Sequence, residues 1–335
     1  METEQKSEVA IAGRLSVAPM MDWTDRYCRV FHRRLSARAL LYTEMVTAQA
    51  VIHGDRQRLL GFDAAEQPVA LQLGGSDPAE LAEAARIGAD AGYVEINLNC
   101  GCPSDRVQSG CFGAVLMKSP DLVAECVARM IKASPVEVTV KCRIGVDAQE
   151  PEQVLPAFIA QMRDAGVRRI AIHARKAWLQ GLSPKDNREI PPLNYPLVHR
   201  MKADFPDLDL SINGGIDSMD AVRDHLRVMD GVMVGRAAYH QPWQILGQAD
   251  LLWGQNPPFD DPVAVAQDMR DVIGAHAATG APMHRYTRHM LGLFHGMPGA
   301  RGWRRQLSEG AARAADRASA LAVYDAALAE VMVPA

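Results

Sequence analysis

The chain has 335 residues, more than an ordinary single domain, and its 48% hydrophobic and 23% charged content is that of a well-packed globular protein, not a disordered one. A formal net charge of −4 excludes a generally basic surface, so any contact with nucleic acid has to come from local basic clusters. Residues 1–10 are charged and lack the apolar core of a signal peptide, and no apolar run reaches the roughly 18 residues that span a membrane.

Short apolar or β-branched segments recur along the first two thirds of the chain, and each is followed by a segment with helical character. Strands that alternate with helices form a parallel sheet, and about eight such units over roughly 240 residues close into a barrel. The sequence therefore predicts an α/β fold, a TIM-type (β/α)8 barrel. The predicted strands are residues 15–20, 39–44, 69–73, 93–99, 136–143, 169–174, 208–213 and 231–235.

The segments between the strands carry apolar residues at three- and four-residue spacing, which is typical of helices. Asp77 and Pro78 open one of them with a capping residue and a proline at the first helical position. An open, doubly wound sheet is the alternative fold, and the lack of a G-x-G-x-x-G motif after the first strand disfavours it. The predicted helices include residues 77–91, 120–133, 151–165 and 219–225.

The alternation of strands and helices stops near residue 240. Residues 256–262 are rich in proline and aspartate, which is typical of a linker or loop, and the chain from residue 263 to its end reads as helical, closing with the alanine-rich segment 310–331. We therefore expect a barrel domain over residues 1–250 and a small all-helical domain over residues 251–335.

Two motifs at predicted strand ends indicate a phosphate site. Asn213-Gly214-Gly215 follows the seventh strand, and Gly235-Arg236 follows the eighth. Glycines let backbone N–H groups approach an anion, arginine adds a fixed charge, and barrels often hold phosphate at these two loops. The glycine pair alone would fit a simple turn equally well, but the two motifs together favour phosphate.

Lys141 lies inside the predicted fifth strand, where an unpaired buried charge is costly. It could form a Schiff base, as in aldolases, or hold the negative charge that develops on a reduced flavin ring. A surface lysine at a strand end is the remaining interpretation. His173, at the end of the sixth strand, is on its own best explained as a core histidine.

Cys102 is the strongest candidate for a catalytic residue. It stands between Gly101 and Pro103 in a loop after the fourth strand, where an irregular backbone exposes the thiol. A free thiol has a pKa of about 8.5, so at neutral pH it is mostly protonated and can act as a general acid. Cys28 and Cys126, at apolar helical spacing, better fit the usual buried and inert cysteine.

The cysteines as a set indicate neither a metal site nor a disulfide framework. Cys100 and Cys102 form a C-x-C motif, but no second pair of ligands is in register with it, and a chain of this size does not need disulfides as staples. We expect no metal, reduced thiols, a cytoplasmic location and no membrane contact. The six cysteines, all in the first half of the chain, are Cys28, Cys100, Cys102, Cys111, Cys126 and Cys142.

One segment of the expected helical domain is strongly basic. Residues 283–306 contain five arginines and three histidines but no acidic residue. Arginine suits planar contacts to phosphate or bases, so the segment is a candidate RNA-binding surface, with a solvated helix face as the alternative. The arginines are Arg285, Arg288, Arg301, Arg304 and Arg305.

These motifs together resemble the tRNA-dihydrouridine synthases, flavoprotein barrels with a helical tRNA-binding domain. The segment 99–104 (NCGCPS) is similar to their cysteine loop, 18–20 (APM) to their first flavin contact, and the two glycine motifs to their phosphate site. The resemblance runs from about Ala18 to past Ser308. Segments that resemble the A subfamily are 173–178 (HARKAW), 181–192 (GLSPKDNREIPP), 288–294 (RHMLGLF) and 298–305 (PGARGWRR).

The resemblance implies roles for individual residues. Cys102 would be the proton donor, and Asn99 would hydrogen-bond the target uracil. Cys100 departs from the family, where an aliphatic residue is expected, and puts a second thiol beside the acid. Residues matching positions that grip tRNA are Lys185, Arg188, Arg301 and Arg304. Residues matching positions that hold FMN, without a covalent link, are Pro19, Met20, Met21, Gln72, Lys141, His173, Asn213, Gly214, Gly215, Gly235 and Arg236.

The implied reaction is the reduction of uridine to dihydrouridine in the D-loop of tRNA, at positions 20 and 20a for this subfamily. NADPH would reduce FMN, the flavin would pass a hydride to C6 of uracil, and Cys102 would protonate C5. A thiol suits this task better than a glutamate, which is ionised near neutral pH. The base would have to leave its stack, at a cost of a few kcal/mol.

Three other functions stay open on the sequence alone. A barrel aldolase would use Lys141 as a Schiff-base nucleophile, and the purified protein would be colourless. A small-molecule FMN-dependent oxidoreductase, resembling dihydroorotate dehydrogenases, would need neither the basic segment nor the helical domain. A pure RNA-binding module would have no use for the reactive side chains at the strand ends.

Overall fold

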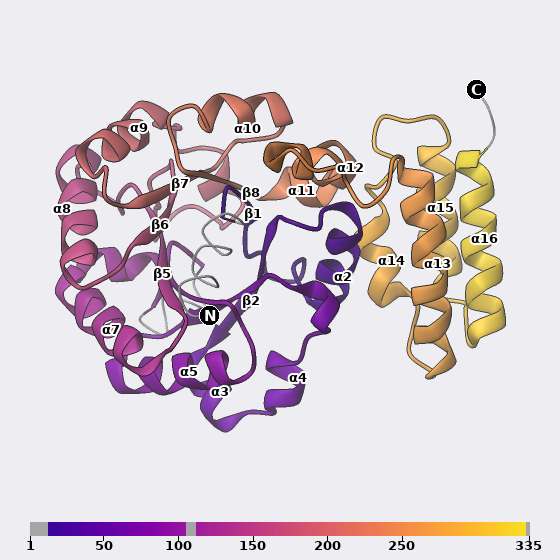
Figure 1. Cartoon of the computed structure of the whole chain (residues 1–335), viewed down its shortest axis with the longest axis horizontal. Coiled ribbons are helices and arrows are strands. Elements are labelled where there is room, and N and C mark those ends of the chain that lie inside the picture. Colours follow the sequence, from indigo (N-terminus) through magenta and orange to yellow (C-terminus); the bar gives the residue numbers. More distant parts are fainter. Residues whose placement is uncertain (1–12, 105–111, 333–335) are drawn as a thin grey trace.

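Eight parallel strands close into a barrel in the order of the sequence, which confirms the predicted (β/α)8 fold (Figure 1). The computed structural model describes residues 13–104 and 112–332. Residues 1–10, which are not expected to form a signal peptide, and Cys111 lie outside those residues. The strands are β1 (Leu15–Val17), β2 (Leu40–Thr47), β3 (Val69–Gly74), β4 (Glu95–Cys100), β5 (Glu137–Arg143), β6 (Arg169–His173), β7 (Asp209–Asn213) and β8 (Gly231–Val234).

β2 departs most from its predicted bounds, because it continues three residues beyond the expected end at residue 44. Its pairing with β3 shifts register between Tyr42 and Met45. An irregularity of this kind bends a strand, and beyond it the sulfur of Met45 lies 3.1 Å from the side-chain nitrogen of Asn99 at the end of β4. The extra length of β2 therefore reaches the edge of the barrel where the strands end.

Helices surround the barrel (Figure 1). The predicted start of α5 (Pro78–Asp90) is confirmed, because the Asp77 carboxylate accepts hydrogen bonds from the backbone of Ala79 and Glu80, and Pro78 takes the first position. The other helices around the barrel are α2 (Arg26–Leu35), α3 (Ala48–His53), α4 (Arg56–Leu60), α7 (Pro120–Ala133), α8 (Pro151–Asp164), α9 (Tyr195–Asp204), α10 (Met219–His225), α11 (Arg236–His240) and α12 (Pro242–Ile245). Short 3-10 helices are η1 (Ala64–Glu66), η2 (Gly113–Lys118), η3 (Asp186–Arg188) and η4 (Leu246–Trp253).

The barrel has an apolar outer shell and a partly polar interior. Along β4, Glu95, Asn97 and Asn99 are buried inside the barrel, whereas the residues between them belong to the apolar cluster that joins strands and helices. This alternation is what a strand needs when its two faces meet different surroundings. A second, smaller apolar cluster that includes Tyr42 and Met233 fills part of the interior.

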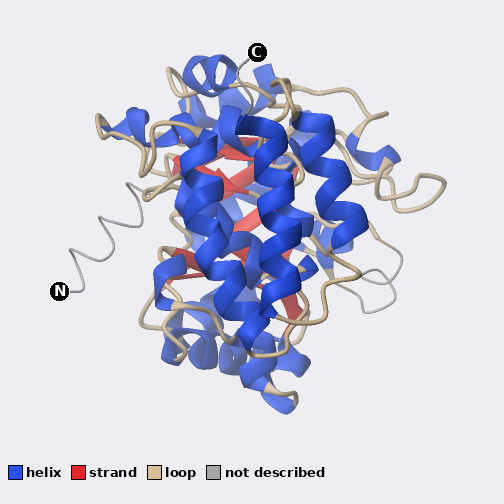
Figure 2. Cartoon of the chain, turned by 90° about the vertical axis from the view of Figure 1, so that its right-hand side faces the viewer, coloured by secondary structure: helices blue, strands red, loops and turns tan. Residues whose placement is uncertain are grey.

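Four helices form a bundle on one side of the barrel, next to α2 (Figure 1), and Figure 2 shows this bundle in front of the strands. Its core contains Phe294, Trp303 and Tyr324, whose rings meet edge to face. The alanine-rich segment 310–331 is helical from Arg317 onward, and a short break separates it from the helix that ends at Gly310. The helices are α13 (Pro262–Ala278), α14 (His284–Met290), α15 (Ala300–Gly310) and α16 (Arg317–Met332).

The proposed domain boundary at residue 250 falls inside η4. The Asp250 carboxylate accepts hydrogen bonds from the Ser36 hydroxyl at 2.5 Å and from the Ala37 backbone at 2.8 Å, so this residue is tied to the barrel. Residues 256–261 contain no helix or strand, and Asp261 caps α13. The division into residues 1–250 and 251–335 stays a prediction. Within the described residues, no helix is long and apolar enough to cross a membrane.

Candidate active site

The loop after β4 holds Cys102 at the mouth of the barrel, the end at which all eight strands finish. Asn99 is buried, and its side-chain oxygen accepts hydrogen bonds from the backbone nitrogens of Gly101, at 2.9 Å, and Cys102, at 3.0 Å. This turn leaves the Cys102 side chain half-buried, with its sulfur 3.4 Å from the Ser104 hydroxyl. The thiol is therefore both accessible and fixed in place by its own strand.

Cys100 faces the opposite way from Cys102. Its side chain is fully buried in the apolar shell outside the barrel, next to Cys142 of β5 in the strand register. Burial raises the pKa of the Cys100 thiol well above its usual value. The expectation of a second thiol beside the acid is therefore wrong, because Cys100 is the last residue of β4 and points into the apolar shell, whereas the chain turns at Gly101 and carries Cys102 to the mouth.

Arg143, at the end of β5, ties the loop after β4 to the loop after β6. Its Nε donates to the carbonyl of Gly101 at 2.9 Å, and its Nη1 donates to the carbonyls of Lys176 at 3.0 Å and Asn187 at 2.9 Å. The side chain is 2% exposed. Arg143 is the last residue of the predicted fifth strand, and no role was predicted for it. Its position two residues after Lys141, on the same strand face, was the available signal.

Asn187 organises the loop that carries two of the predicted tRNA contacts. Its side chain is fully buried, accepts from the backbone nitrogen of Trp178 at 2.7 Å and donates to the carbonyls of Trp178 and Leu182. These bonds close the loop on itself, and Lys185 and Arg188 remain exposed on it. No sequence pattern singled out Asn187, because its partners lie in an irregular loop.

Positive charges converge at the end of β5 and β6. Burial, and then the charge of Arg143, lower the pKa of Lys141 to about 8. Burial, followed by the charges of Arg143 and Lys141, lowers the pKa of His173 well below its usual range, so this histidine is neutral at pH 7. Lys141 lies opposite Asn99 in the strand register, and His173 lies opposite Arg143. The described residues thus hold a lysine and an arginine side by side at the mouth.

Three further arginines extend this positive region. Burial and the charge of Arg236 lower the pKa of Arg188, and burial together with Arg236 also lowers the pKa of Arg175. Arg236, predicted to bind phosphate, forms an ion pair with Glu189, with 2.6 Å between Nη1 and Oε1. The Glu189 carboxylate therefore competes with a phosphate group for the positive charge of Arg236.

The glycine pair after β7 does more than turn the chain. Gly214 and Gly215 have φ angles of +106° and +71°, in the region that favours glycine. A Cβ on Gly214 would lie 2.4 Å from Cδ2 of His173, and one on Gly215 would lie 2.5 Å from Cδ1 of Leu193. Glycine thus lets this backbone lie directly against the His173 ring. Asn213 anchors the turn by donating to the carbonyl of Met233 at 2.7 Å.

The loop after β1 meets the end of β8. A Cβ on Gly235 would come within 3.8 Å of both Ala18 and the sulfur of Met20 and would find no closer atom. Pro19 and Met20 are half-buried, and Met21 is 52% exposed. The first and last strands therefore bring these predicted flavin contacts together, as closure of the barrel requires.

The mouth fits a bound anion such as the phosphate of a flavin nucleotide. Burial and neighbouring cations disfavour the charged state of the lysine and arginines, so an anion placed among them would be attracted from several sides. The positive-φ glycines leave backbone unobstructed by a Cβ beside them. No group of three or more metal-ligating side chains occurs among the described residues.

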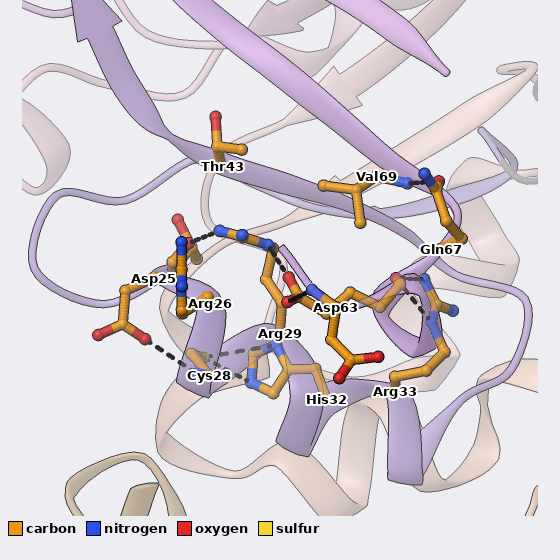
Figure 3. A network of polar contacts seen from close by, with 12 residues as sticks. Asp25, Arg26, Cys28, Arg29, His32, Arg33, Thr43, Asp63, Gln67 and Val69 are labelled. Carbon is orange, nitrogen blue, oxygen red and sulfur yellow. Dashed lines mark hydrogen bonds and ion pairs between the residues drawn. The ribbon is translucent and has the colours of Figure 1, made fainter. Parts of the chain in front are cut away.

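The basic segment 283–306 is not a uniform RNA-binding surface. Arg288 and His289 contact the two oxygens of Asp25 at 2.5 and 3.0 Å, and Arg285 donates to the Tyr27 hydroxyl at 2.9 Å. These contacts dock α14 on the start of α2, where Asp25 also caps the helix through the Cys28 nitrogen (Figure 3). The acids that balance this segment come from elsewhere in the chain.

Arg301 and Arg304 differ from the other arginines of the segment. Both side chains are exposed on α15, and neither forms an ion pair with any described residue, whereas Arg305 contacts Glu330 at 3.3 Å. α15 lies beyond α14 as seen from the barrel (Figure 1). The structure therefore does not bring these two arginines to the mouth, where the other predicted site residues gather.

Comparison with known proteins identifies the family. The profile described as Dihydrouridine synthase (Dus) matches residues 16–330. The chain is 57% identical over 300 residues to the tRNA-dihydrouridine(20/20a) synthase of Xanthomonas campestris, with 90% of this chain and 89% of that protein covered. It is 52% identical to the protein of the same name from Pseudomonas aeruginosa, with 95% of each chain covered.

The fold also resembles that of a solved structure. The old yellow enzyme homologue from Zymomonas mobilis superposes with a TM-score of 0.50 at 13% identity, over 68% of this chain and 86% of that one. This likeness concerns the fold alone. The match of the family profile to nearly the whole chain, together with the identity to curated relatives, decides the assignment: the chain belongs to the dihydrouridine synthase family.

Proposed function

We propose that the chain is a tRNA-dihydrouridine(20/20a) synthase, which reduces uridine in the D-loop of tRNA with FMN as its flavin and NADPH as the source of electrons. The observation that carries the proposal is the fixed, accessible thiol of Cys102 beside a buried cluster of cations at the barrel mouth. Names of relatives at 51–57% identity support the two target positions. The five described cysteines are free thiols, which supports a cytoplasmic location.

The proposed flavin site uses the mouth as it stands. Lys141 and the neutral His173 would meet the ring, and backbone N–H groups of Gly214 and Gly215 would meet the phosphate, with Arg236 released from Glu189. When bound, the flavin supplies the hydride that reduces C6 of uracil. The full proposed set is Pro19, Met20, Met21, Gln72, Lys141, His173, Asn213, Gly214, Gly215, Gly235 and Arg236.

Cys102 is the proposed general acid. Addition of hydride to C6 builds enolate-like charge on the uracil ring, and the thiol delivers a proton to C5. The Asn99 oxygen is engaged by the cysteine loop, and its amide nitrogen contacts Gln72 and, weakly, the sulfur of Met45. A uracil carbonyl would replace the weak sulfur contact, so Asn99 can meet the base without releasing the loop.

Two separate surfaces are proposed to hold the tRNA. Lys185 and Arg188 lie on the loop that Asn187 closes, beside the mouth, and would hold the RNA near the target base. Arg301 and Arg304 lie on α15 in the helical bundle and would hold a distant part of the same molecule. Arginine contacts at both places would offset the cost of drawing the uracil out of its stack.

The test combines an absorbance spectrum with nucleoside analysis. Purified protein should show flavin absorption without covalent attachment, and with NADPH it should form dihydrouridine at positions 20 and 20a of an unmodified tRNA transcript. A colourless protein, even after incubation with FMN, would overturn the proposal and favour the aldolase. A flavoprotein that leaves tRNA unchanged would favour a small-molecule oxidoreductase.

A further inference from the structure

A continuous chain of hydrogen bonds crosses the barrel interior from its base to the cysteine loop. At the base, Arg169 contacts Glu95 at 2.9 Å and Glu137 at 2.7 Å. The other oxygen of Glu95 accepts from the Thr139 hydroxyl at 2.6 Å, and Thr139 in turn accepts from Asn97 at 2.8 Å. The interior is thus connected through buried polar side chains.

The upper half of the chain reaches the proposed acid. The Asn97 oxygen accepts from the Gln72 amide at 2.8 Å, and the Gln72 oxygen accepts from the Asn99 amide at 3.2 Å. The Asn99 oxygen then accepts from the backbone nitrogen of Cys102 at 3.0 Å. Gln72, Asn97 and Thr139 are each 2% exposed or less, so this part of the chain is shielded from bulk water.

The direction of every bond in the chain follows from its charged end. Arg169 has only donors, so Glu95 is held as an acceptor and takes the single proton of the Thr139 hydroxyl. Thr139 must then accept from Asn97, which points the Asn97 oxygen toward Gln72. Each amide orients the next, because a flipped side chain would set a buried donor against a donor or an acceptor against an acceptor.

We infer that Thr139 and Asn97 are positioning residues for the reaction, because they pass the orientation imposed by Glu95 and Arg169 to Asn99. Asn99 consequently presents its oxygen to the loop of Cys102 and its nitrogen to Gln72. The inference rests on the proposed role of Cys102 as the acid. Neither Thr139 nor Asn97 belongs to the proposed set of ligand-binding residues.

Thr139→Val is the direct test, because valine keeps the shape and removes the hydroxyl. Alkylation of Cys102 by iodoacetamide, followed by peptide mass spectrometry without flavin, should rise about threefold or more as the loop loosens. The kcat for dihydrouridine formation should fall roughly tenfold, the effect of one hydrogen bond, with KM for tRNA unchanged. Thr139→Ser, which retains the hydroxyl, should stay near wild type in both measurements.

Tyr42→Phe is the matched control. It removes another hydrogen bond to the same oxygen of Glu95, 2.5 Å long, but leaves the path from Thr139 to Asn99 intact. It should lower thermal stability without changing Cys102 alkylation or kcat. Equal effects of Tyr42→Phe and Thr139→Val, or no effect of a folded Thr139→Val, would overturn the inference. If Thr139→Val does not fold, Thr139→Cys, a weak hydrogen-bonding replacement of similar size, takes its place with the same criteria.

The alkylation experiment tests the positioning roles of Thr139 and Asn97 separately from the proposed function. It needs neither flavin nor tRNA, so it decides the positioning roles even if the wild-type protein forms no dihydrouridine. If the wild-type protein forms no dihydrouridine, the proposed function fails. Faster alkylation of Cys102 in the Thr139→Val variant would still support the positioning roles of Thr139 and Asn97. Conversely, normal dihydrouridine formation with unchanged alkylation in the valine variant overturns the positioning roles alone.

Discussion

Arg143 donates from Nε to the carbonyl of Gly101 across 2.9 Å, so a side chain of the fifth strand fixes the loop that the fourth strand carries. The same guanidinium holds Lys176 and Asn187, at two points of the loop between β6 and α9. Two loops that are distant in the sequence therefore depend on one buried group. This relationship makes Arg143 a sensitive point for both stability and activity.

Arg143→Lys should disturb both loops, because a lysine cannot satisfy three carbonyls spread over a planar fork. We expect the free energy of unfolding to fall by about 1–3 kcal/mol for each buried carbonyl left without a donor, together with a marked loss of dihydrouridine formation. Urea unfolding and nucleoside analysis measure the two effects. Arg168→Lys, at an exposed arginine before β6, is the control. Equal stability of the two variants would contradict the role given to Arg143.

Cys102→Ala should retain flavin and tRNA binding but lose turnover by about 10²–10⁴-fold, the usual contribution of a general acid. Cys100→Ala is the matched control, since the Cys100 thiol lies in the apolar shell and its loss should affect stability, not turnover. Flavin absorbance, tRNA affinity and single-turnover dihydrouridine formation distinguish the two variants. Near-normal product from Cys102→Ala would require another proton donor.

FMN affinity should fall as the pH rises through about 8, the value to which burial and Arg143 lower the pKa of Lys141. Binding of an anion favours the charged lysine and raises its pKa, so above the free value binding must take up a proton. The loss approaches about tenfold per pH unit until the pKa of the bound form is reached. Fluorescence titration above pH 7, where a phosphate monoester with a second pKa of about 6 is already ionised, measures this dependence.

The Lys141→Met variant checks that this pH dependence belongs to Lys141. Its FMN affinity should be lower at pH 7 and nearly constant up to the pH where the wild-type affinity has dropped. An equally steep fall in the variant would assign the titration to another group. A pH-independent wild-type affinity would show that Lys141 does not meet the flavin.

Glu189→Gln should strengthen FMN binding, because it frees Arg236 from a competing carboxylate. The pair is about 40% exposed, so the expected gain is small, about two- to fivefold. Glu152→Gln, which breaks an exposed ion pair between α8 and Arg200 of α9, should leave FMN affinity unchanged. A weaker FMN affinity of Glu189→Gln would show that Glu189 orients Arg236 instead of competing with the phosphate.

Arg301→Ala combined with Arg304→Ala should weaken tRNA binding and leave flavin reduction by NADPH intact. If both arginines meet phosphates, the slope of log affinity against log salt should fall by about 0.7–0.9 for each lost contact. Arg305→Ala removes an arginine already paired with Glu330 and serves as the control. If the double variant has the same tRNA affinity and salt slope as Arg305→Ala, Arg301 and Arg304 do not contact tRNA and belong to an ordinary solvated helix face.

The fold was predictable because its signals are local. Eight apolar segments separated by helices, and a capping aspartate before Pro78, depend only on neighbours in the chain. The strand ends were likewise predictable, and with them the position of Cys102 and of the glycine motifs. The orientation of Cys100 was not predictable in this way: the C-x-C spacing suggested two neighbouring thiols, and the turn after β4, held by Asn99, separates Cys102 from the buried Cys100.

The contacts that shape the site were not predictable, because they join residues far apart in sequence. Arg236 meets Glu189 from 47 positions away, and Arg288 meets Asp25 from 263 positions away. Composition could show that the segment 283–306 contains no acidic residue. It could not show that Asp25, which lies before α2, is the acidic partner of Arg288 and His289. Side-chain partners of this kind depend on the assembled fold.

Asp25 contacts both the barrel and the helical bundle. One carboxylate caps α2, receives Arg288 and His289 from α14, and stands four residues after Met21 of the loop that precedes α2. The helical bundle is therefore joined to the barrel through this carboxylate. A barrel expressed alone would lose the Arg288 and His289 contacts to Asp25, and a chimaera with a foreign bundle would need replacement hydrogen-bond donors at the same place.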